Sequence, residues 1–197
     1  MGSPTPTTPP SGEGLAARLR PVLPVLAWLL LALLLRWLVL EPRWIPSGSM
    51  LPTLQLQDRV LVQKIGPRLG LPLRPGTIVV FHPPPTLLAA GYDPDAALIK
   101  RVVAVAGEQV AVQGGRLYRN GEAVNPDWSS EPIDYELPTI TVPAGHVLVL
   151  GDNRNASLDS HLWGPLPEQD VLGTAIWRYW PPQRFGPIRF SPSLGGG

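Results

Sequence analysis

The segment 21–40 (PVLPVLAWLLLALLLRWLVL) constrains the fold more than any other part of this 197-residue chain. Seventeen of its twenty residues are Ala, Val, Leu or Trp, and its one charged residue is Arg36. A helix of this length spans about 30 Å, which matches the hydrocarbon core of a bilayer. We therefore predict a transmembrane helix over residues 21–40, with Trp37 and Trp44 at the membrane interface.

Two other interpretations of this segment fit less well. A cleaved secretory signal peptide has a shorter apolar region and a small-x-small cleavage site, whereas this segment continues as EPRWIPSGSM. A buried helix of a globular domain has a polar face, and this segment has none. Arg18 and Arg20 precede the span, so we predict a cytoplasmic N-terminus and an extracytoplasmic location for the domain that follows.

Composition divides the rest of the chain into three parts. Residues 1–20 begin with a Pro/Thr/Ser/Gly-rich run and are predicted to be disordered, and residues 187–197 are predicted to be a flexible tail. Residues 41–186 contain short β-type runs separated by turn signals such as Gly114-Gly115 and Asn120-Gly121. We predict a mainly β domain built on antiparallel sheet. The predicted strands cover residues 59–65, 77–81, 98–105, 109–113, 116–119, 146–150 and 173–180.

Charge and residue usage exclude several functions. The chain has sixteen Lys and Arg and fifteen Asp and Glu, so its charges nearly cancel. It therefore lacks the basic surface that a nucleic-acid partner requires. It has no cysteine, which excludes a disulfide framework and a thiol nucleophile. Its three histidines are scattered without metal-ligand spacing. We expect no nucleic acid, no metal and no cofactor.

Two candidate reactive groups stand in separate motifs. Ser49 lies in a Ser-Gly-Ser turn between two prolines, only nine residues beyond Leu40, so the turn lies within about 30 Å of the predicted span. Taken alone, this turn also fits a plain linker. Lys100 lies in the run 98–105, whose two faces are both largely apolar. A buried lysine has a lowered pKa and serves as a general base, but a lysine near a strand end also extends into solvent, and the residues alone leave both alternatives open.

A third motif, the polar run 151–164 (GDNRNASLDSHLWG), follows the apolar run 146–150 directly. Functional residues are common in loops at the ends of strands. The alternative is a purely structural loop in which Arg154 pairs with Asp152 or Asp159.

Together these motifs resemble the type I signal peptidases, the membrane-bound Ser/Lys endopeptidases that remove signal peptides from exported proteins. They occur in that family's order and approximate spacing. His161 and the ending RYWPP at 178–182 are similar to the cyanobacterial and chloroplast branch. The matching motifs are IPSGSMLPTL (45–54), RVLVQK (59–64), GTIVVF (76–81), IKRVVAVAG (99–107) and GDNRNASLDSHLWG (151–164).

The resemblance implies a role for several residues. It makes Ser49 the nucleophile, Lys100 its general base and Ser47 a side-chain donor to the oxyanion. It also implies that Ser157 orients the lysine amine. The implied supporting ion pair is Arg154 with Asp159. Many members of the family have Arg where this chain has His161, so the role of that position stays open. The resemblance implies a substrate groove lined by Ile45, Pro46, Met50, Leu54, Leu98 and Ile99.

The same resemblance implies the fold and the setting. The fold is the antiparallel β domain of the signal peptidase and self-cleaving repressor type, with one N-terminal transmembrane helix. The substrates are preproteins with signal peptides, cut after small-x-small (Ala-x-Ala) motifs at the surface of a lipid bilayer. The implied membrane is the plasma membrane or the thylakoid membrane.

Other functions remain as alternatives. A Ser-His-Asp hydrolase would use Ser49 with His82, His146 or His161, and no fixed spacing excludes such a triad. A non-catalytic anchored β domain would bind partners, but such a module is not expected to retain both Ser49 and Lys100. The related self-cleaving repressors carry a DNA-binding module and no membrane span.

Overall fold

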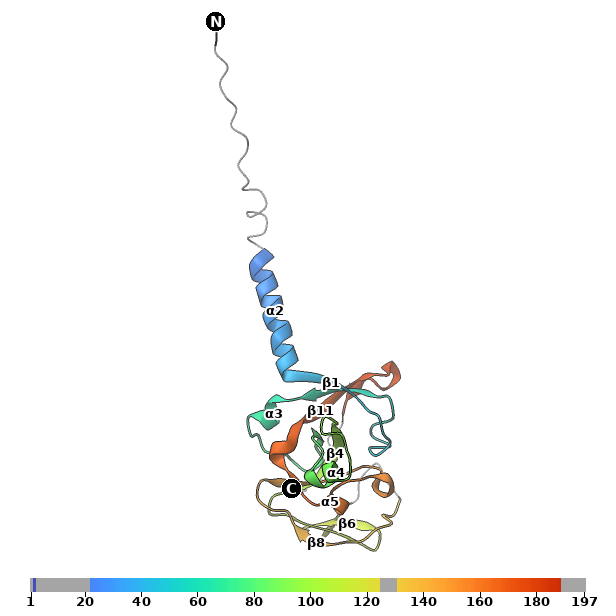
Figure 1. Ribbon diagram of the computed structural model, residues 1–197. Helices are drawn as coiled ribbons and strands as arrows, with labels where there is room; N and C mark the ends of the chain where they lie inside the picture. The colour runs from blue at the N-terminus through green and yellow to red at the C-terminus, as the bar shows by residue number, and fades with distance from the viewer. Residues whose placement is uncertain (1, 3–21, 125–130, 189–197) are drawn as a thin grey trace. The chain divides into compact units, whose positions relative to one another are not determined.

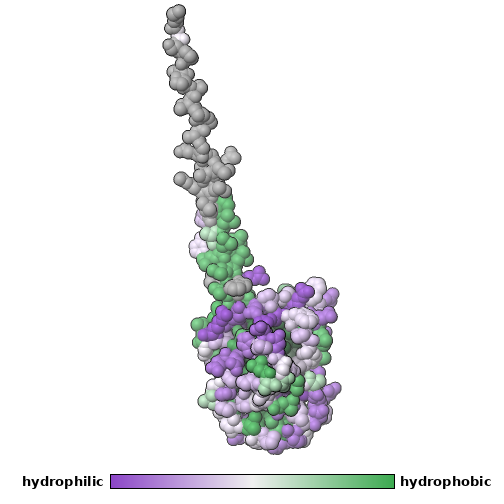
Figure 2. Space-filling model, viewed as in Figure 1, coloured by the Kyte–Doolittle hydropathy of each residue, from purple (hydrophilic) through white to green (hydrophobic). Residues whose placement is uncertain are grey.

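The computed structural model describes residue 2, residues 22–124 and residues 131–188, and the chain divides into two compact units after Leu38. Helix α2 (Val22–Val39) is the main element of the first unit (Figure 1), and Figure 2 shows its apolar surface. Among the described residues, no helix combines the length and the hydropathy that a membrane crossing requires, so the predicted transmembrane helix is not confirmed. The large apolar side chains exposed on α2 are Val22, Val25, Leu26, Trp28, Leu29, Leu30, Leu31, Leu33, Leu34 and Leu38.

The second unit is mainly β, and its described strand pairs are all antiparallel, which confirms the predicted antiparallel β domain. The larger sheet has the strand order β1-β2-β11-β3-β4-β9-β10, and β12 pairs with β11. Its strands are β1 (Leu40–Trp44), β2 (Arg59–Gln63), β3 (Ile78–Phe81), β4 (Leu98–Val105), β9 (His146–Leu150), β10 (Leu166–Pro167), β11 (Val171–Trp180) and β12 (Gly186–Pro187).

A smaller sheet of four strands has the order β7-β6-β5-β8. In Figure 1 it lies at the lower end of this unit, where β6 and β8 are labelled. Its strands are β5 (Gln109–Gln113), β6 (Arg116–Arg119), β7 (Glu122–Val124) and β8 (Leu137–Thr141). The connections form short helices, which are α3 (Ile65–Arg68), α4 (Pro85–Ala89), α5 (Ser160–Trp163), η1 (Arg154–Ala156), η2 (Glu168–Asp170) and η3 (Pro182–Arg184).

The predicted strands agree with the observed ones where the apolar pattern is strong. β4, β5, β6 and β9 have the predicted bounds, and Gly114, Gly115, Asn120 and Gly121 all have positive φ at the predicted turns. Strands β1, β7 and β8 were not predicted, because they are short and contain charged residues or proline. Such segments become strands only through the neighbour with which they pair.

Both predicted disordered ends lie almost wholly outside the described residues. For 1–20 only Gly2 is described, and for 187–197 only residues 187 and 188 are. Pro187 belongs to β12 and pairs with Trp177, so the ordered domain extends slightly past residue 186.

Apolar side chains form three clusters, and β4 contributes to each of them. Ile99 packs in a cluster with β2 and β3, Val102 in a cluster with β9, and Val103 in a cluster with the smaller sheet. Every residue of β4 from 99 to 104 is buried. A residue on this strand is therefore held firmly from both faces.

Candidate active site

Ser49 lies on a tight turn between β1 and β2, and three buried side chains hold this turn in place. Ile45 precedes the turn, and Met50 and Leu54 follow Ser49 by one and five residues. All three are at most 2% exposed and pack in the same cluster as Ile99 of β4. The Ser49 hydroxyl therefore sits on a turn whose neighbours are fixed in the core.

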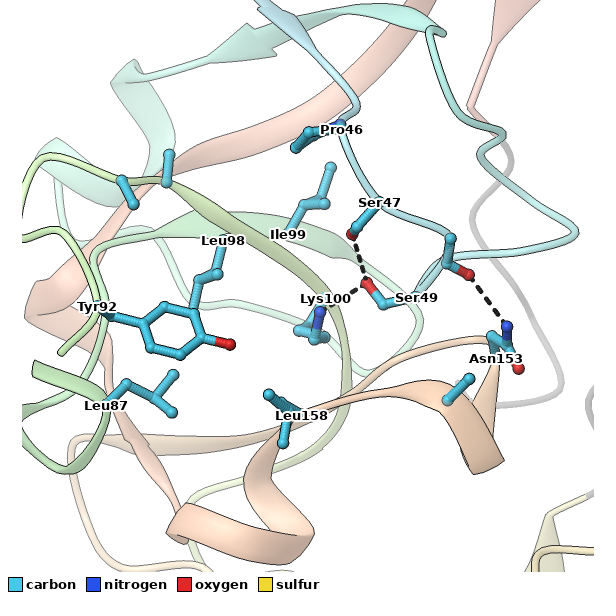
Figure 3. Close-up of a pocket in the computed structure, with 14 residues that line it drawn as sticks. Pro46, Ser47, Ser49, Leu87, Tyr92, Leu98, Ile99, Lys100, Asn153 and Leu158 are labelled. Atoms are coloured by element: carbon cyan, nitrogen blue, oxygen red, sulfur yellow. Dashed lines mark hydrogen bonds between the residues drawn. The ribbon is translucent and has the colours of Figure 1, made fainter. Parts of the chain in front are cut away.

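Lys100 lies in the middle of the larger sheet and points toward Ser49 (Figure 3). Lys100 is 4% exposed, and its Nζ donates a hydrogen bond to Ser49 Oγ at 2.8 Å. The structure thus places Lys100 in the interior rather than extending into solvent. Burial lowers the pKa of Lys100 from 10.5 to about 8, and the charges of Asp159 and Asp152 act in the opposite direction.

Ser47 lies on the same turn as Ser49, and their Oγ atoms are 3.4 Å apart. Within the described part of the chain, the backbone amide of Ser49 makes no hydrogen bond. A hydroxyl and a backbone N–H are therefore both available next to the Ser49 side chain. Donors arranged in this way stabilise a negative oxygen that forms beside a nucleophile.

The polar loop 151–163 packs against the back of the Ser49 turn. Asn153 N–H donates to the Ser49 carbonyl at 3.0 Å, and Asn153 Nδ2 donates to the Gly48 carbonyl at 3.1 Å. Gly151 is in tight contact with the same turn, because a Cβ added there would lie 2.6 Å from the Ser49 carbonyl oxygen. The same Cβ would also lie 2.2 Å from Ser157 Oγ, an atom that is buried without a hydrogen-bond partner among the described residues. The predicted contact between Ser157 and the lysine amine is therefore not present as a hydrogen bond.

A buried ion pair connects this loop to β4. Arg101 Nε and Nη2 each donate to a different oxygen of Asp152 at 2.7 Å, and both side chains are at most 1% exposed. Arg101 also donates to the Gly76 carbonyl at 2.7 Å. Neither residue was predicted as a site residue, although both belong to the motifs that carry the family resemblance.

Asp159 has a different partner from the one expected. Its Oδ1 lies 2.7 Å from His161 Nδ1, and its Oδ2 accepts a hydrogen bond from Gly151 N–H at 2.8 Å. Among the described residues, no ion pair joins Asp159 to Arg154, so the expected pairing is corrected to Asp159 with His161. Arg154 is itself buried in this loop, and burial lowers its pKa.

A cavity of about 480 Å³ opens in front of the serine and the lysine (Figure 3). Of the predicted groove residues, Pro46, Leu98 and Ile99 line it. Ile45, Met50 and Leu54 do not, because their side chains face the core, and this part of the predicted groove is corrected. The lining residues that the sequence interpretation did not name are Gly48, Leu87, Tyr92, Ala96, Ala97, Asn153, Ala156 and Leu158.

The unpredicted wall of the cavity comes from the connection between β3 and β4. Leu87 of α4 and Tyr92 form it, and Figure 3 shows the Tyr92 hydroxyl pointing into the cavity. The apolar run in PPPTLLAAGY at 83–92 is the only sequence signal for this wall, and such a run does not say what it faces. Pairing of β3 with β4 brings it to the site.

The three histidines make no hydrogen bond to Ser49 within the residues that the structure describes. His161 pairs with Asp159, and His146 Nδ1 is bonded to the Ala144 carbonyl. None of the hydrogen bonds in the described ranges joins His82, His146 or His161 to Ser49. Across the same ranges, no group of three or more His, Cys, Asp or Glu side chains is placed to hold a metal ion.

The fold and the site define an antiparallel β protein with a buried lysine hydrogen-bonded to a serine beside an apolar cavity. Residues 18–180 match the family described as signal peptidase, peptidase S26. The chain therefore belongs to this family, as the motifs predicted, and it is an endopeptidase of the signal peptidase I type.

Its relatives include cyanobacterial and chloroplast proteins, which confirms the predicted branch. A probable signal peptidase I-1 from Synechocystis is 49% identical over 160 residues, covering 81% of each chain. A signal peptidase I from Leptolyngbya laminosa is 42% identical over 198 residues, covering 97% of each chain. A probable chloroplastic thylakoidal processing peptidase 2 from Arabidopsis thaliana is 46% identical over 157 residues, covering 80% of this chain and 42% of that protein.

Replacement of Gly151 is expected to disrupt the site without unfolding the domain. In Gly151→Ala the new methyl group collides with the Ser157 side chain and the Ser49 carbonyl, so the Ser49 turn must move. Misplacement of a reacting group by about 1 Å costs on the order of 100-fold in rate, and we expect a loss of that size in kcat on a preprotein substrate. The control is Gly66→Ala, whose methyl group meets only the flexible end of Gln63, at 3.3 Å. Equal activity of the two variants would contradict this account of the turn.

Proposed function

We propose that this chain is a membrane-anchored serine endopeptidase that removes N-terminal signal peptides from exported preproteins with a Ser49–Lys100 dyad. The observation that carries the proposal is the 2.8 Å contact between Lys100 Nζ and Ser49 Oγ inside the domain. A serine hydroxyl is a weak nucleophile until a base takes its proton, and a neutral lysine in a desolvated site is such a base. The lowered pKa of Lys100 supports this role.

In the proposed reaction, Ser49 Oγ attacks the carbonyl carbon of the scissile peptide bond and its proton passes to Lys100 Nζ. The Ser47 hydroxyl and the Ser49 N–H donate to the oxyanion that forms. Lys100 then gives the proton to the departing amine, which leaves an acyl group on Ser49. In the second half, Lys100 takes a proton from water, the hydroxide attacks the acyl carbon, and Ser49 regains its proton.

We propose that Asp159, Arg154 and Ser157 support the Ser49–Lys100 dyad. The charge of Asp159 raises the pKa of Lys100 and so opposes the effect of burial. Arg154 is buried in the same loop and faces the charges of Asp152 and Asp159. Ser157 Oγ is buried and has no hydrogen-bond partner in the described chain, which leaves it available for the proposed contact with the lysine amine.

We propose that cleavage follows a small-x-small motif such as Ala-x-Ala. The cavity beside Ser49 is lined mainly by apolar residues, and the bulky side chains of Leu87, Tyr92 and Leu158 restrict its width. A small apolar side chain fits such a space, whereas a charged side chain would lose its hydration there. The predicted contacts of Pro46, Leu98 and Ile99 with substrate are part of this proposal.

We also propose that residues 21–40 anchor the chain, with residues 1–20 in the cytoplasm and the catalytic domain 41–186 on the other side of the plasma or thylakoid membrane. The support is the apolar sequence of the segment and the exposed apolar side chains of α2. Sodium carbonate extraction of membranes containing the full chain tests the anchor, since an anchored chain stays in the membrane fraction.

The dyad is tested by replacement of each member. Ser49→Ala and Lys100→Met are each expected to abolish cleavage of a preprotein by the detergent-solubilised chain while the circular dichroism spectrum is unchanged. N-terminal sequencing of the wild-type product checks the small-x-small motif. His82→Ala and His146→Ala are matched controls that should retain activity. An active Lys100→Met variant together with an inactive histidine variant would favour a Ser-His-Asp mechanism instead.

The pH dependence of kcat/KM tests the state of the lysine. Only the neutral amine accepts the Ser49 proton, and below its pKa the amine is protonated, so kcat/KM should rise as the pH increases through about 8. Asp159→Asn removes a negative charge that raises this pKa, so the rise should move to lower pH. The range from pH 7 to pH 9 extends about one pH unit on each side of this pKa. A wild-type kcat/KM that stays constant over this range would exclude Lys100 as the base.

The contribution of the anchor is tested with a truncated chain that begins at Val39, the first residue of the second compact unit. This chain retains Ser47, Ser49, Lys100 and Ser157 and should cleave a short soluble peptide at the full-length rate. On a preprotein in liposomes we expect a loss of roughly tenfold or more, because the anchor holds enzyme and substrate on one surface. Equal losses on both substrates would show that residues 1–38 support folding rather than substrate encounter.

A further inference from the structure

An aromatic ring from outside the catalytic loop packs against His161. Tyr135 lies just before β8, and its ring is stacked on the His161 imidazole with centroids 3.9 Å apart and planes at 11°. The same Tyr135 packs against the apolar cluster of the smaller sheet. The ring therefore connects the core of the smaller sheet to α5, which follows Asp159.

The stacked imidazole holds one oxygen of Asp159. An ionised carboxylate only accepts hydrogen bonds, so the proton of this contact lies on His161 Nδ1, which donates to Asp159 Oδ1 at 2.7 Å. Gly151 N–H donates to the other oxygen at 2.8 Å. Both oxygens of Asp159 are thus fixed, and the side chain is fully buried.

A second connection holds the Tyr135 segment against the loop. Asp134 N–H donates to Asn155 Oδ1 at 3.0 Å, and Asn155 Nδ2 donates to the Pro132 carbonyl at 3.0 Å. The backbone on the N-terminal side of Tyr135 is therefore bound to the same loop that its ring contacts. This leaves the ring little freedom to move away from His161.

The ring of Tyr135 acts through its face and not through its hydroxyl. Burial raises the pKa of Tyr135, with a further contribution from the charge of Asp159, so the hydroxyl stays neutral. Its Oη is buried and has no hydrogen-bond partner among the described residues. Removal of this hydroxyl therefore breaks no contact, whereas removal of the ring leaves the imidazole unsupported.

Asp159 is connected to the reacting serine through Gly151. Its Oδ2 binds Gly151 N–H, and Gly151 packs directly against the carbonyl of Ser49. Its charge also acts on Lys100. A shift of the Asp159 carboxylate would therefore reach both members of the Ser49–Lys100 pair.

We propose that Tyr135 and His161 are positioning residues, which hold Asp159 so that Gly151, Ser49 and Lys100 keep their reacting geometry. The proposal rests on the proposed function of the Ser49–Lys100 pair. It gives the smaller sheet a part in catalysis, and it assigns a role to His161, which the family resemblance left open.

The test compares paired variants of the full chain in detergent on a soluble preprotein peptide. Tyr135→Phe keeps the ring and should retain wild-type kcat, whereas Tyr135→Leu loses the stack and should lower kcat about threefold to tenfold, the usual range for an aromatic pair. His161→Asn places an amide N–H near the position of Nδ1 and should retain most of kcat. His161→Leu removes the side-chain donor to Asp159 Oδ1, which then keeps only the longer bond from the His161 backbone N–H at 3.3 Å, and should lower kcat on the order of tenfold to a hundredfold. KM should change little in each case, because none of these side chains lines the cavity.

The outcomes separate this inference from the proposed function. If wild-type protein does not cleave the peptide, the proposed function fails. If wild-type protein cleaves it and the Leu variants keep wild-type kcat, or lose activity through KM alone, the positioning role is wrong. If His161→Leu does not fold, as judged by circular dichroism, His161→Gln replaces that variant. The glutamine side chain is longer than that of asparagine and moves the amide donor away from Asp159. Equal kcat for His161→Gln and His161→Asn would then overturn the proposal.

Discussion

The buried pair of Arg101 and Asp152 is the interaction on which the arrangement of the site depends. Burial of two charges is costly unless each hydrogen-bonding position is used. Here the guanidinium makes two bonds of 2.7 Å to the carboxylate, a third bond of 2.7 Å to the Gly76 carbonyl, and a longer contact of 3.4 Å to Thr53 Oγ1. One side chain thus joins β4, the loop after β9, the turn before β3 and the Ser49 turn. Any other arrangement of these four segments would leave a buried charge without its hydrogen bonds, which is costly.

The pleat of β4 lets adjacent residues perform different tasks. Successive side chains on a strand point to opposite faces. Lys100 therefore reaches Ser49 on one face, while Arg101 reaches Asp152 on the other. The lysine needs a desolvated environment to lose its proton near neutral pH, and the neighbouring carboxylates moderate that effect. The pairing of β4 with β3 and β9 provides the burial, and the loop after β9 provides the carboxylates.

The two sheets contribute differently to the site. The larger sheet carries Lys100 and positions the Ser49 turn through Ile45, Met50 and Leu54, which pack beneath it. The smaller sheet contributes through the segment before β8, where Tyr135 contacts His161. Met50 and Leu54, which follow Ser49, therefore belong to the core, whereas part of the cavity wall comes from residues about 40 positions away, such as Leu87 and Tyr92.

Local patterns in the sequence were sufficient to predict β4, the turns at Gly114-Gly115 and Asn120-Gly121, and the pairing of Ser49 with Lys100 through the family motifs. These features depend on the alternation of side chains along a strand, on positive φ and on short motifs, and each of these is determined by a few neighbouring residues. The burial of Lys100, the partner of Asp159, the inward direction of Met50 and the contact of Tyr135 with His161 did not follow from such patterns. Each of them depends on which distant segments pack together, as in the hydrogen bond between Ser49 and Lys100 across 51 positions of the chain. Alternation along a strand separates its two faces, but only the packing of the other elements decides which face is dry, which is charged and which borders the cavity.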